Sequence, residues 1–189
     1  MTTVGYIVGS LSASSMNRML AETLAELAPV GMEFREIEIG NLPLYNRDFD
    51  ANYPQAGRDL KDALADVDAV VIVTPEYSRS IPGALKNALD WSARPWGTNS
   101  FAGKATAVIG MAPGGPGTAM AQQHLRNILA HFNARTMGQP EAFVQYNPEA
   151  WVDGKLQDES LRGVLSQWLG ALETHIEMVR AADLVAARA

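Results

Sequence analysis

The chain has 189 residues, of which 47% are hydrophobic, and its formal net charge is −6 at pH 7. This length and composition suit one domain with a sizeable core. The acidic balance, without any Lys/Arg run, excludes nucleic acid and anionic membrane surfaces as expected partners. The sequence has no cysteine, which removes disulfides, thiolate metal sites and thiol nucleophiles. Any redox chemistry must therefore come from a bound cofactor.

The N-terminus enters an apolar segment within a few residues and lacks a basic region followed by a long apolar signal. No apolar stretch reaches membrane-spanning length. We therefore expect a cytoplasmic protein that forms a single domain over residues 1–189, without a membrane partner. The alanine-rich end, residues 181–189, is expected to fray.

Five segments are predicted to be strands. Residues 4–8 form an apolar run, and residues 32–39 alternate between polar and apolar types before the pattern shifts, which is typical of an edge strand. Residues 68–74 are a near-continuous β-branched run, which indicates a central strand covered on both faces. Residues 104–110 form a similar run, and residues 142–144 could supply a shorter fifth strand.

Helices are predicted between and after these strands, at residues 15–28, 57–65, 82–93, 117–134 and 160–180. The last has the clearest pattern, with Leu161, Trp168 and Ile176 among apolar residues that recur at three- and four-residue steps. Strands that alternate with helices predict a parallel sheet with helices on both faces. We expect a flavodoxin-like three-layer α/β sandwich whose five strands follow the order 2-1-3-4-5.

In such sheets a ligand binds beyond the carboxyl ends of the strands, where the winding reverses between strands 1 and 3. The loops at residues 10–17, 75–80 and 111–118 should converge there. The first loop lies between a strand and a helix and carries hydroxyls at Ser10, Ser12 and Ser15. Backbone N–H groups, hydroxyls and the positive end of a helix macrodipole favour a phosphate monoester at this junction.

The first loop differs from the commoner phosphate-binding motifs. It lacks the Gly-x-Gly-x-x-Gly spacing of a dinucleotide site, and the only Gly-Lys pair, Gly103-Lys104, has no Ser or Thr after it. A hydroxyl-lined loop without a lysine suits a single terminal phosphate that is bound permanently, and flavin mononucleotide (FMN) fits that description. Helix capping and turn chemistry alone would also explain a serine-rich stretch before a helix.

The second loop contains Pro75 and Pro82, which restrict its backbone to few conformations. Such a loop could present backbone groups to a flat heterocycle, which could stack on Tyr77. The alternative is a rigid turn before a helix. In the third loop, Gly114 and Gly115 would let the backbone approach a ligand, or simply make the connection flexible.

Arg94 follows the third predicted helix and could attract an anionic substrate or the phosphates of a nicotinamide cofactor at the pocket mouth, although an exposed surface arginine is the simpler reading. His124 and His131 lie seven residues apart on one predicted helix, about 10 Å along its axis, too far for both to bind one ion. No metal site is expected.

Three segments of the chain closely resemble the NADPH-dependent FMN reductase family, and its chromate and quinone reductases most of all. They are Gly9-Ser10-Leu11 through Ser15-Met16-Asn17, then Thr74-Pro75-Glu76-Tyr77, and the block from Ile81-Pro82-Gly83 through Lys86-Asn87-Ala88-Leu89-Asp90-Trp91. By this resemblance, FMN would be held by Ser10, Ser12, Ser15, Met16, Asn17, Pro75, Glu76, Tyr77, Ser78, Met111, Ala112, Gly114 and Gly115.

The sequence departs from the family pattern at two places. Members often carry an arginine where Ser12 stands, so phosphate binding here would rely more on N–H groups and hydroxyls. Several have Asn-Tyr where this chain has Ser78-Arg79, so acceptor preference does not transfer. The family commonly forms dimers or tetramers, and the resemblance therefore implies a homodimer or homotetramer.

The expected function is that of an FMN-containing oxidoreductase. It would take a hydride from NADH or NADPH and reduce quinones, chromate, ferric complexes or free flavins with ping-pong kinetics. Tyr77 and Arg94 are the expected catalytic residues. The main alternative is a non-enzymatic flavodoxin-type electron carrier, and a third is a binding module for another phosphorylated ligand.

Overall fold

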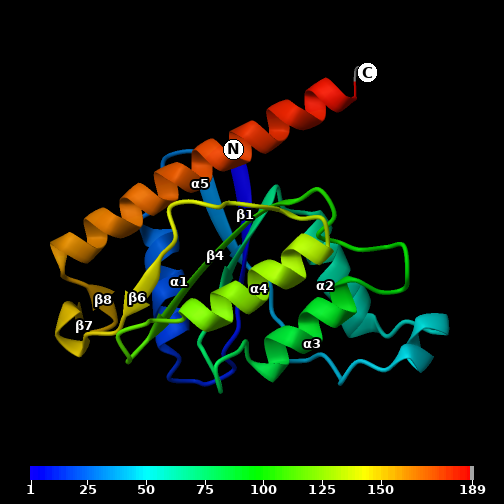
Figure 1. Ribbon diagram of the computed structural model, residues 1–189, viewed down its shortest axis with the longest axis horizontal. Coiled ribbons are helices and arrows are strands. Elements are labelled where there is room, and N and C mark those ends of the chain that lie inside the picture. Colours follow the sequence, from blue (N-terminus) through cyan, green and yellow to red (C-terminus); the bar gives the residue numbers. More distant parts are fainter. Residues whose placement is uncertain (188–189) are drawn as a thin grey trace.

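The structure is a computed structural model that describes residues 1–187 of the chain. Figure 1 shows a parallel sheet between two layers of helices. The sheet is six-stranded, and its path is β2-β1-β3-β4-β5, with β6 also paired to β4. Its strands are β1 (Thr2–Val8), β2 (Met32–Glu36), β3 (Ala69–Val73), β4 (Ala105–Ala112), β5 (Arg135–Thr136) and β6 (Phe143–Gln145). The predicted order 2-1-3-4-5 is confirmed.

The central position of β3 follows from its sequence. All five of its residues are buried, because β1 and β4 pair with it on either side and helices cover both faces. Alternate residues of β3 belong to opposite cores: Val71 and Val73 face one layer, while Val70 and Ile72 face the other. The second strand lies at the sheet edge, as its mixed pattern predicted.

Within the described residues, five α-helices form the outer layers. They are α1 (Met16–Glu26), α2 (Gln55–Ala65), α3 (Gly83–Ser92), α4 (Ala119–His131) and α5 (Glu159–Ala186). The core on one face contains Leu20 and Leu24 of α1 with Trp168 and Leu169 of α5. In the core on the other face, the helical residues come from α2, α3 and α4. Within residues 1–187, no helix is both long enough and apolar enough to cross a membrane.

The fifth position of the sheet differs from the sequence prediction. Two short strands share it: β5 pairs with the start of β4, and β6, which overlaps the predicted strand at residues 142–144, pairs with its end. The segment between them contains Gly138 and Pro140. Proline has no N–H to donate to a β-ladder, so one continuous strand is disfavoured there.

At the end of the chain, residues 181–186 of the segment expected to fray are helical. Helix α5 continues to Ala186 (Figure 1), and residues 188–189 lie outside the described part. The late turns of α5 are anchored because Arg180 contacts Asp68 and Asp183 contacts Arg135. Short elements that the sequence pattern did not predict are the 3₁₀ turns η1 (Arg47–Ala51) and η2 (Pro148–Ala150), and the hairpin of β7 (Trp151–Val152) and β8 (Lys155–Leu156).

Candidate functional site

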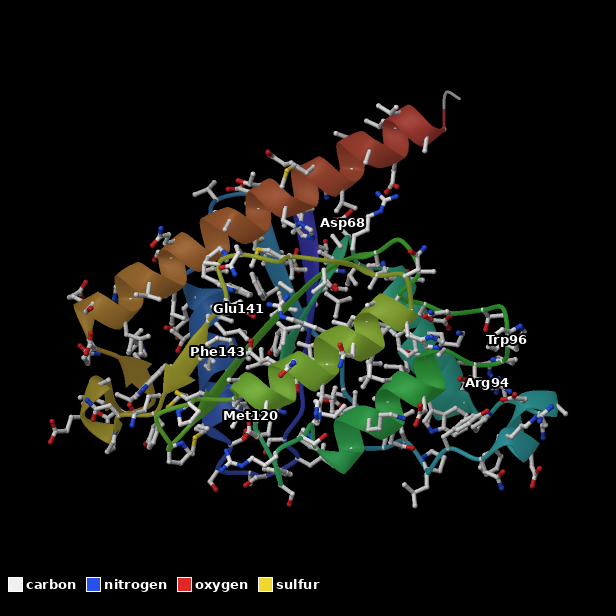
Figure 2. The ribbon with its side chains drawn as sticks, in the orientation of Figure 1. Asp68, Arg94, Trp96, Met120, Glu141 and Phe143 are labelled. Atoms are coloured by element: carbon white, nitrogen blue, oxygen red, sulfur yellow. The ribbon has the colours of Figure 1, made fainter. Side chains whose placement is uncertain are left out.

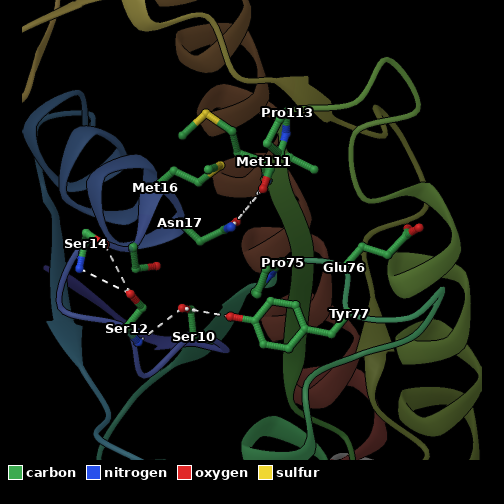
Figure 3. A pocket seen from close by; sticks show the side chains of 12 residues that line it. Ser10, Ser12, Ser14, Met16, Asn17, Pro75, Glu76, Tyr77, Met111 and Pro113 are labelled. Atoms are coloured by element: carbon green, nitrogen blue, oxygen red, sulfur yellow. Dashed lines mark hydrogen bonds between the residues drawn. The ribbon is translucent and has the colours of Figure 1, made fainter.

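A pocket opens at the carboxyl ends of β1, β3 and β4, where the three predicted loops meet (Figure 3). This is the point at which the winding of the sheet reverses, and it confirms the predicted convergence. The lining residues are Ser10, Ser12, Ser14, Ser15, Met16, Asn17, Pro75, Glu76, Tyr77, Met111, Ala112 and Pro113.

In the first loop, serine hydroxyls accept hydrogen bonds from the loop's own backbone. Ser12 N–H donates to Ser10 Oγ and Ser14 N–H donates to Ser12 Oγ, each at 3.3 Å. Ser15 caps α1, because its hydroxyl accepts from Arg18 N–H at 3.2 Å. Capping and turn chemistry therefore account for these contacts of Ser10, Ser12 and Ser15, and the cofactor role of these residues stays a prediction.

The start of α1 offers donors to an anion. The N–H groups in the first turn of a helix have no carbonyl one turn earlier to bind, and they point out of the N-terminus with the positive end of the macrodipole. No lysine or arginine lines the pocket in the described residues. Arg18 is occupied by Glu36, 2.7 Å away. An anion bound here would depend on N–H groups and hydroxyls. We predicted this because Ser12 stands where family members often carry an arginine.

Asn17 joins the first loop to the third. Its amide Nδ2 donates to the carbonyl of Met111 at 2.8 Å, and its Oδ1 accepts from Met111 N–H at 2.9 Å (Figure 3). Asn17 is only 1% exposed, so these two bonds satisfy groups that water does not reach. The resemblance assigns Asn17 to the cofactor, but in the structure its amide holds β4 against α1.

The second loop is a tight turn with backbone pairing. Tyr77 and Ser80 exchange hydrogen bonds between their N–H and C=O groups at 2.9 and 3.0 Å. Between them, Ser78 and Arg79 have φ of 51° and 66°, the left-handed values of a two-residue hairpin turn. Neither is glycine or asparagine, so the turn is held at a cost of order 1 kcal/mol per residue.

Tyr77 closes one side of the pocket. Its side chain is half exposed, and its hydroxyl lies 3.4 Å from Ser10 Oγ across the opening (Figure 3). Pro75 presents an apolar surface beside it, and Met111 and Pro113 do so from the third loop. A flat aromatic ligand could therefore stack on Tyr77 while its polar edges meet backbone groups.

Not every residue predicted for the site lies in the pocket. Ser78, Gly114 and Gly115 are absent from its lining, because the turn tip and the glycines lie beyond the segments that face it. Sequence reasoning missed Ser14 and Pro113. Both are adjacent to predicted residues, so position in the loop was the signal that could have found them.

Arg94 lies in a separate part of the molecule (Figure 2). Its guanidinium donates to Tyr45 Oη at 2.8 Å and forms an ion pair with Asp50. Arg94 and Tyr45 line a hollow together with Arg47 and the exposed Trp96. Tyr53 packs on Trp91, and burial is the main cause that raises its pKa to about 12. Arg94 was expected at the pocket mouth, but within one chain it does not line that pocket.

The fold and the pocket define the class of protein. A parallel sheet in the order β2-β1-β3-β4-β5, with a serine-lined helix N-terminus facing an aromatic loop at the switch point, is the architecture of flavodoxin-like mononucleotide-binding proteins. The donor set fits FMN, since hydroxyls and N–H groups would meet its phosphate and an aromatic and apolar wall would meet its ring.

Comparison with known proteins identifies the family. A family model described as NADPH-dependent FMN reductase matches residues 2–149. A 2-hydroxy-1,4-benzoquinone reductase from Burkholderia sp is 44% identical over 168 residues, covering 88% of this chain and 91% of that protein. The chain belongs to the NADPH-dependent FMN reductase family. It is an NAD(P)H-dependent oxidoreductase with FMN as its cofactor.

Solved structures agree with this assignment. The flavoenzyme NAD(P)H:(acceptor) oxidoreductase FerB from Paracoccus denitrificans superposes with a TM-score of 0.90 at 43% identity, covering 94% of this chain and 98% of that one. A flavodoxin from Pseudomonas aeruginosa gives a TM-score of 0.59 at 17% identity, covering 91% of this chain and 99% of the flavodoxin. The second match shows a shared fold alone.

Proposed function

We propose that this enzyme is a quinone reductase that works by ping-pong transfer through FMN bound in the pocket of Figure 3. The observation that carries the proposal is the placement of Ser10, Ser12 and Ser15 at the N-terminus of α1, opposite Tyr77. The name of the Burkholderia relative supports a quinone as the acceptor. Chromate, ferric complexes and free flavins are further acceptors that an open pocket would admit.

In this proposal the residues of the chain bind and orient. N–H groups of the first turn of α1 and the serine hydroxyls hold the phosphate. The 75–77 segment and the 111–113 segment hold the ring from two sides. When bound, FMN accepts a hydride from NAD(P)H and gives two electrons to the quinone, which takes up two protons to become a hydroquinone. The hydride step requires no acid or base from the protein. The main contribution of the protein is therefore to position the reactants.

The kinetic part of the proposal follows from the shape of the site. The pocket is open to solvent, with the half-exposed Tyr77 on one side of the opening. Donor and acceptor would therefore occupy the same face in turn, which gives ping-pong kinetics. We also propose that the chain forms a homo-oligomer in which the exposed Trp96, 83% accessible in the single chain, is covered. Size-exclusion chromatography with light scattering tests this part.

The function is tested by stopped-flow absorbance under anaerobic conditions. The purified protein should be yellow, should lose its flavin absorbance within a turnover when mixed with NADPH or NADH, and should recover it when 2-hydroxy-1,4-benzoquinone is added. Initial rates at several quinone concentrations should give parallel double-reciprocal lines. Absorbance that persists with both nicotinamides would favour the electron carrier, and a folded protein that ignores added FMN would contradict the cofactor site.

Ser12→Asp tests the phosphate end of the site. A carboxylate at this position would repel the phosphate, and we expect the dissociation constant of FMN to rise at least about tenfold, equivalent to about 1.4 kcal/mol. Ser12→Ala, which removes the hydroxyl without adding charge, should have a smaller effect. Quenching of FMN fluorescence measures both. Full flavin content in Ser12→Asp would show that the phosphate lies elsewhere.

A further inference from the structure

Glu76 belongs to the second loop, but its carboxylate points away from the centre of the pocket. Its Oε2 accepts from the N–H groups of Met120, at 3.1 Å, and Ala121, at 3.2 Å, in the first turn of α4. The side chain is 11% exposed. Figure 3 shows Glu76 directed toward α4, and Figure 2 labels Met120 on that helix. A residue of the ring-binding loop is thus bonded to a helix 44 positions further along the chain.

Helix α4 has no side-chain cap of its own. Thr118 occupies the N-cap position, but its side chain makes no capping bond. Its hydroxyl instead accepts from Gln122 Nε2 at 3.0 Å. The first turn also contains no acidic residue. Glu76 therefore supplies what an N-cap normally supplies: an acceptor for the second and third N–H groups and a negative charge at the positive end of the helix.

Tyr77 follows Glu76 directly and points the opposite way. Its hydroxyl faces Ser10 across the pocket, while Glu76 faces α4 (Figure 3). A second contact holds the same loop on the same helix, since Ser80 Oγ lies 3.0 Å from His124 Nδ1. Because Tyr77 and Ser80 are paired through their backbones, residues 77–80 form one hydrogen-bonded unit. The place of Tyr77 in the pocket therefore depends on where α4 holds Glu76.

We propose that Glu76 is a positioning residue for the cofactor. It fixes the segment at residues 75–80 on the N-terminus of α4, and so sets the distance between the surface that meets the ring and the serine loop that meets the phosphate. It acts as a hydrogen-bond acceptor for α4, and direct contact with the ring is not required. This inference rests on the proposed FMN site and adds to it a reason why a glutamate stands between Pro75 and Tyr77.

Three variants separate the effects of the hydrogen-bond acceptor, the negative charge and the length of the Glu76 side chain. Glu76→Ala removes the acceptor. Glu76→Gln keeps an oxygen at the same reach and removes the charge, while Glu76→Asp keeps the charge and withdraws the oxygen by one methylene. The matched control is Asp158→Ala. Asp158 caps α5 in the same manner, accepting from Leu161 N–H at 2.9 Å, and lies outside the pocket.

The first measurement is the dissociation constant of FMN, read from quenching of its fluorescence. We expect it to rise about tenfold in Glu76→Ala, as the loss of about 1.4 kcal/mol would give, and nearly as much in Glu76→Asp. Glu76→Gln should restore most of the affinity, and Asp158→Ala should leave it unchanged. The circular dichroism of bound FMN in the visible range should change in Glu76→Ala and return in Glu76→Gln.

The second measurement is hydrogen exchange of the protein before FMN is added. Residues 75–80 and the first turn of α4 should exchange faster in Glu76→Ala than in the wild type, and Asp158→Ala should not affect them. Wild-type FMN affinity in Glu76→Ala would overturn the proposal, and so would a Glu76→Gln as weak as Glu76→Ala or an equal loss in Asp158→Ala. A wild-type protein that binds no FMN would overturn the proposed function, while the exchange experiment would still decide whether Glu76 holds the loop.

Discussion

The two ends of the same parallel sheet are held together by different kinds of polar contact. At the carboxyl end, beside the pocket, buried or partly buried side chains bond to backbone groups: Asn17 pairs with Met111, and Glu76 caps α4. At the amino end, half-exposed ion pairs tie α5 to the sheet, with Arg180 3.0 Å from Asp68 and Asp183 2.7 Å from Arg135.

This difference matches what each end must do. A buried backbone group that loses its partner costs about 1–3 kcal/mol, so buried contacts hold the pocket loops in one position. A solvent-exposed ion pair contributes about 0–1 kcal/mol and tolerates movement. The end that positions a cofactor is therefore expected to be rigid, and the end that only anchors a helix can remain adaptable. Three substitutions test this contrast, in decreasing order of expected effect.

Gly110→Ala should cause the largest loss, more than about 3 kcal/mol of unfolding free energy. A Cβ on Gly110 would overlap the carbonyl oxygen of Thr74 and the hydroxyl of Thr118, and a backbone atom in a central strand cannot move aside. Gly5→Ala is the matched control: its Cβ would lie 2.6 Å from Cδ1 of Ile37, the end of a flexible side chain. Urea denaturation should show a smaller loss of about 1 kcal/mol there, and equal losses would contradict the contrast.

Asn17→Leu should destabilise the protein by about 2–3 kcal/mol, because Met111 would keep a buried N–H and C=O without partners. Thr23→Val is the control on the same helix. The hydroxyl of Thr23 bonds only to Met19 one turn earlier, so its loss should cost less than about 1 kcal/mol. Chemical denaturation measures both, and FMN affinity should fall in Asn17→Leu alone. A stable Asn17→Leu that retains FMN would show that the hydrogen bonds between Asn17 and Met111 are dispensable.

Asp68→Asn should have the smallest effect, up to about 1 kcal/mol at pH 7, and the effect should depend on pH. Burial by itself would raise the pKa of Asp68, but the N–H of Thr3 at 2.8 Å and the guanidinium of Arg180 lower it below its usual value. A carboxylate with a lowered folded-state pKa stabilises the protein above the unfolded-state pKa, and this contribution is lost as pH falls through the folded-state value.

The wild type and Asp68→Asn should therefore differ in melting temperature at pH 7 and converge as the pH falls below the folded-state pKa of Asp68. Arg180→Met breaks the same ion pair but leaves Thr3 N–H bonded to a charged carboxylate, so it should cost less than Asp68→Asn, in which the acceptor is a neutral amide oxygen. A constant difference between the wild type and Asp68→Asn across the pH range would mean that the carboxylate charge is not what stabilises this end.

Local patterns were sufficient for the sheet and for most of the pocket. The β-branched run at residues 69–73 predicted a doubly covered strand, and the placement of Ser10, Pro75 and Met111 directly after strands predicted that their loops would meet. Both inferences depend on periodicity and chain order, which are properties of neighbouring residues. The split of the fifth position between β5 and β6 was missed, because it depends on which part of β4 each short segment reaches.

The sequence by itself determined the strand order, the position of the pocket and the chemical types that line it, since each follows from the hydrophobic period and from the residues at strand ends. Only the tertiary structure decided where the polar side chains point. It directed Asn17 to Met111 and Glu76 to α4, and it placed Arg94 beside Asp50 in a separate hollow. Those partners are far away in the chain. Tertiary packing determines which distant polar groups a side chain reaches, and a local sequence pattern does not specify that packing.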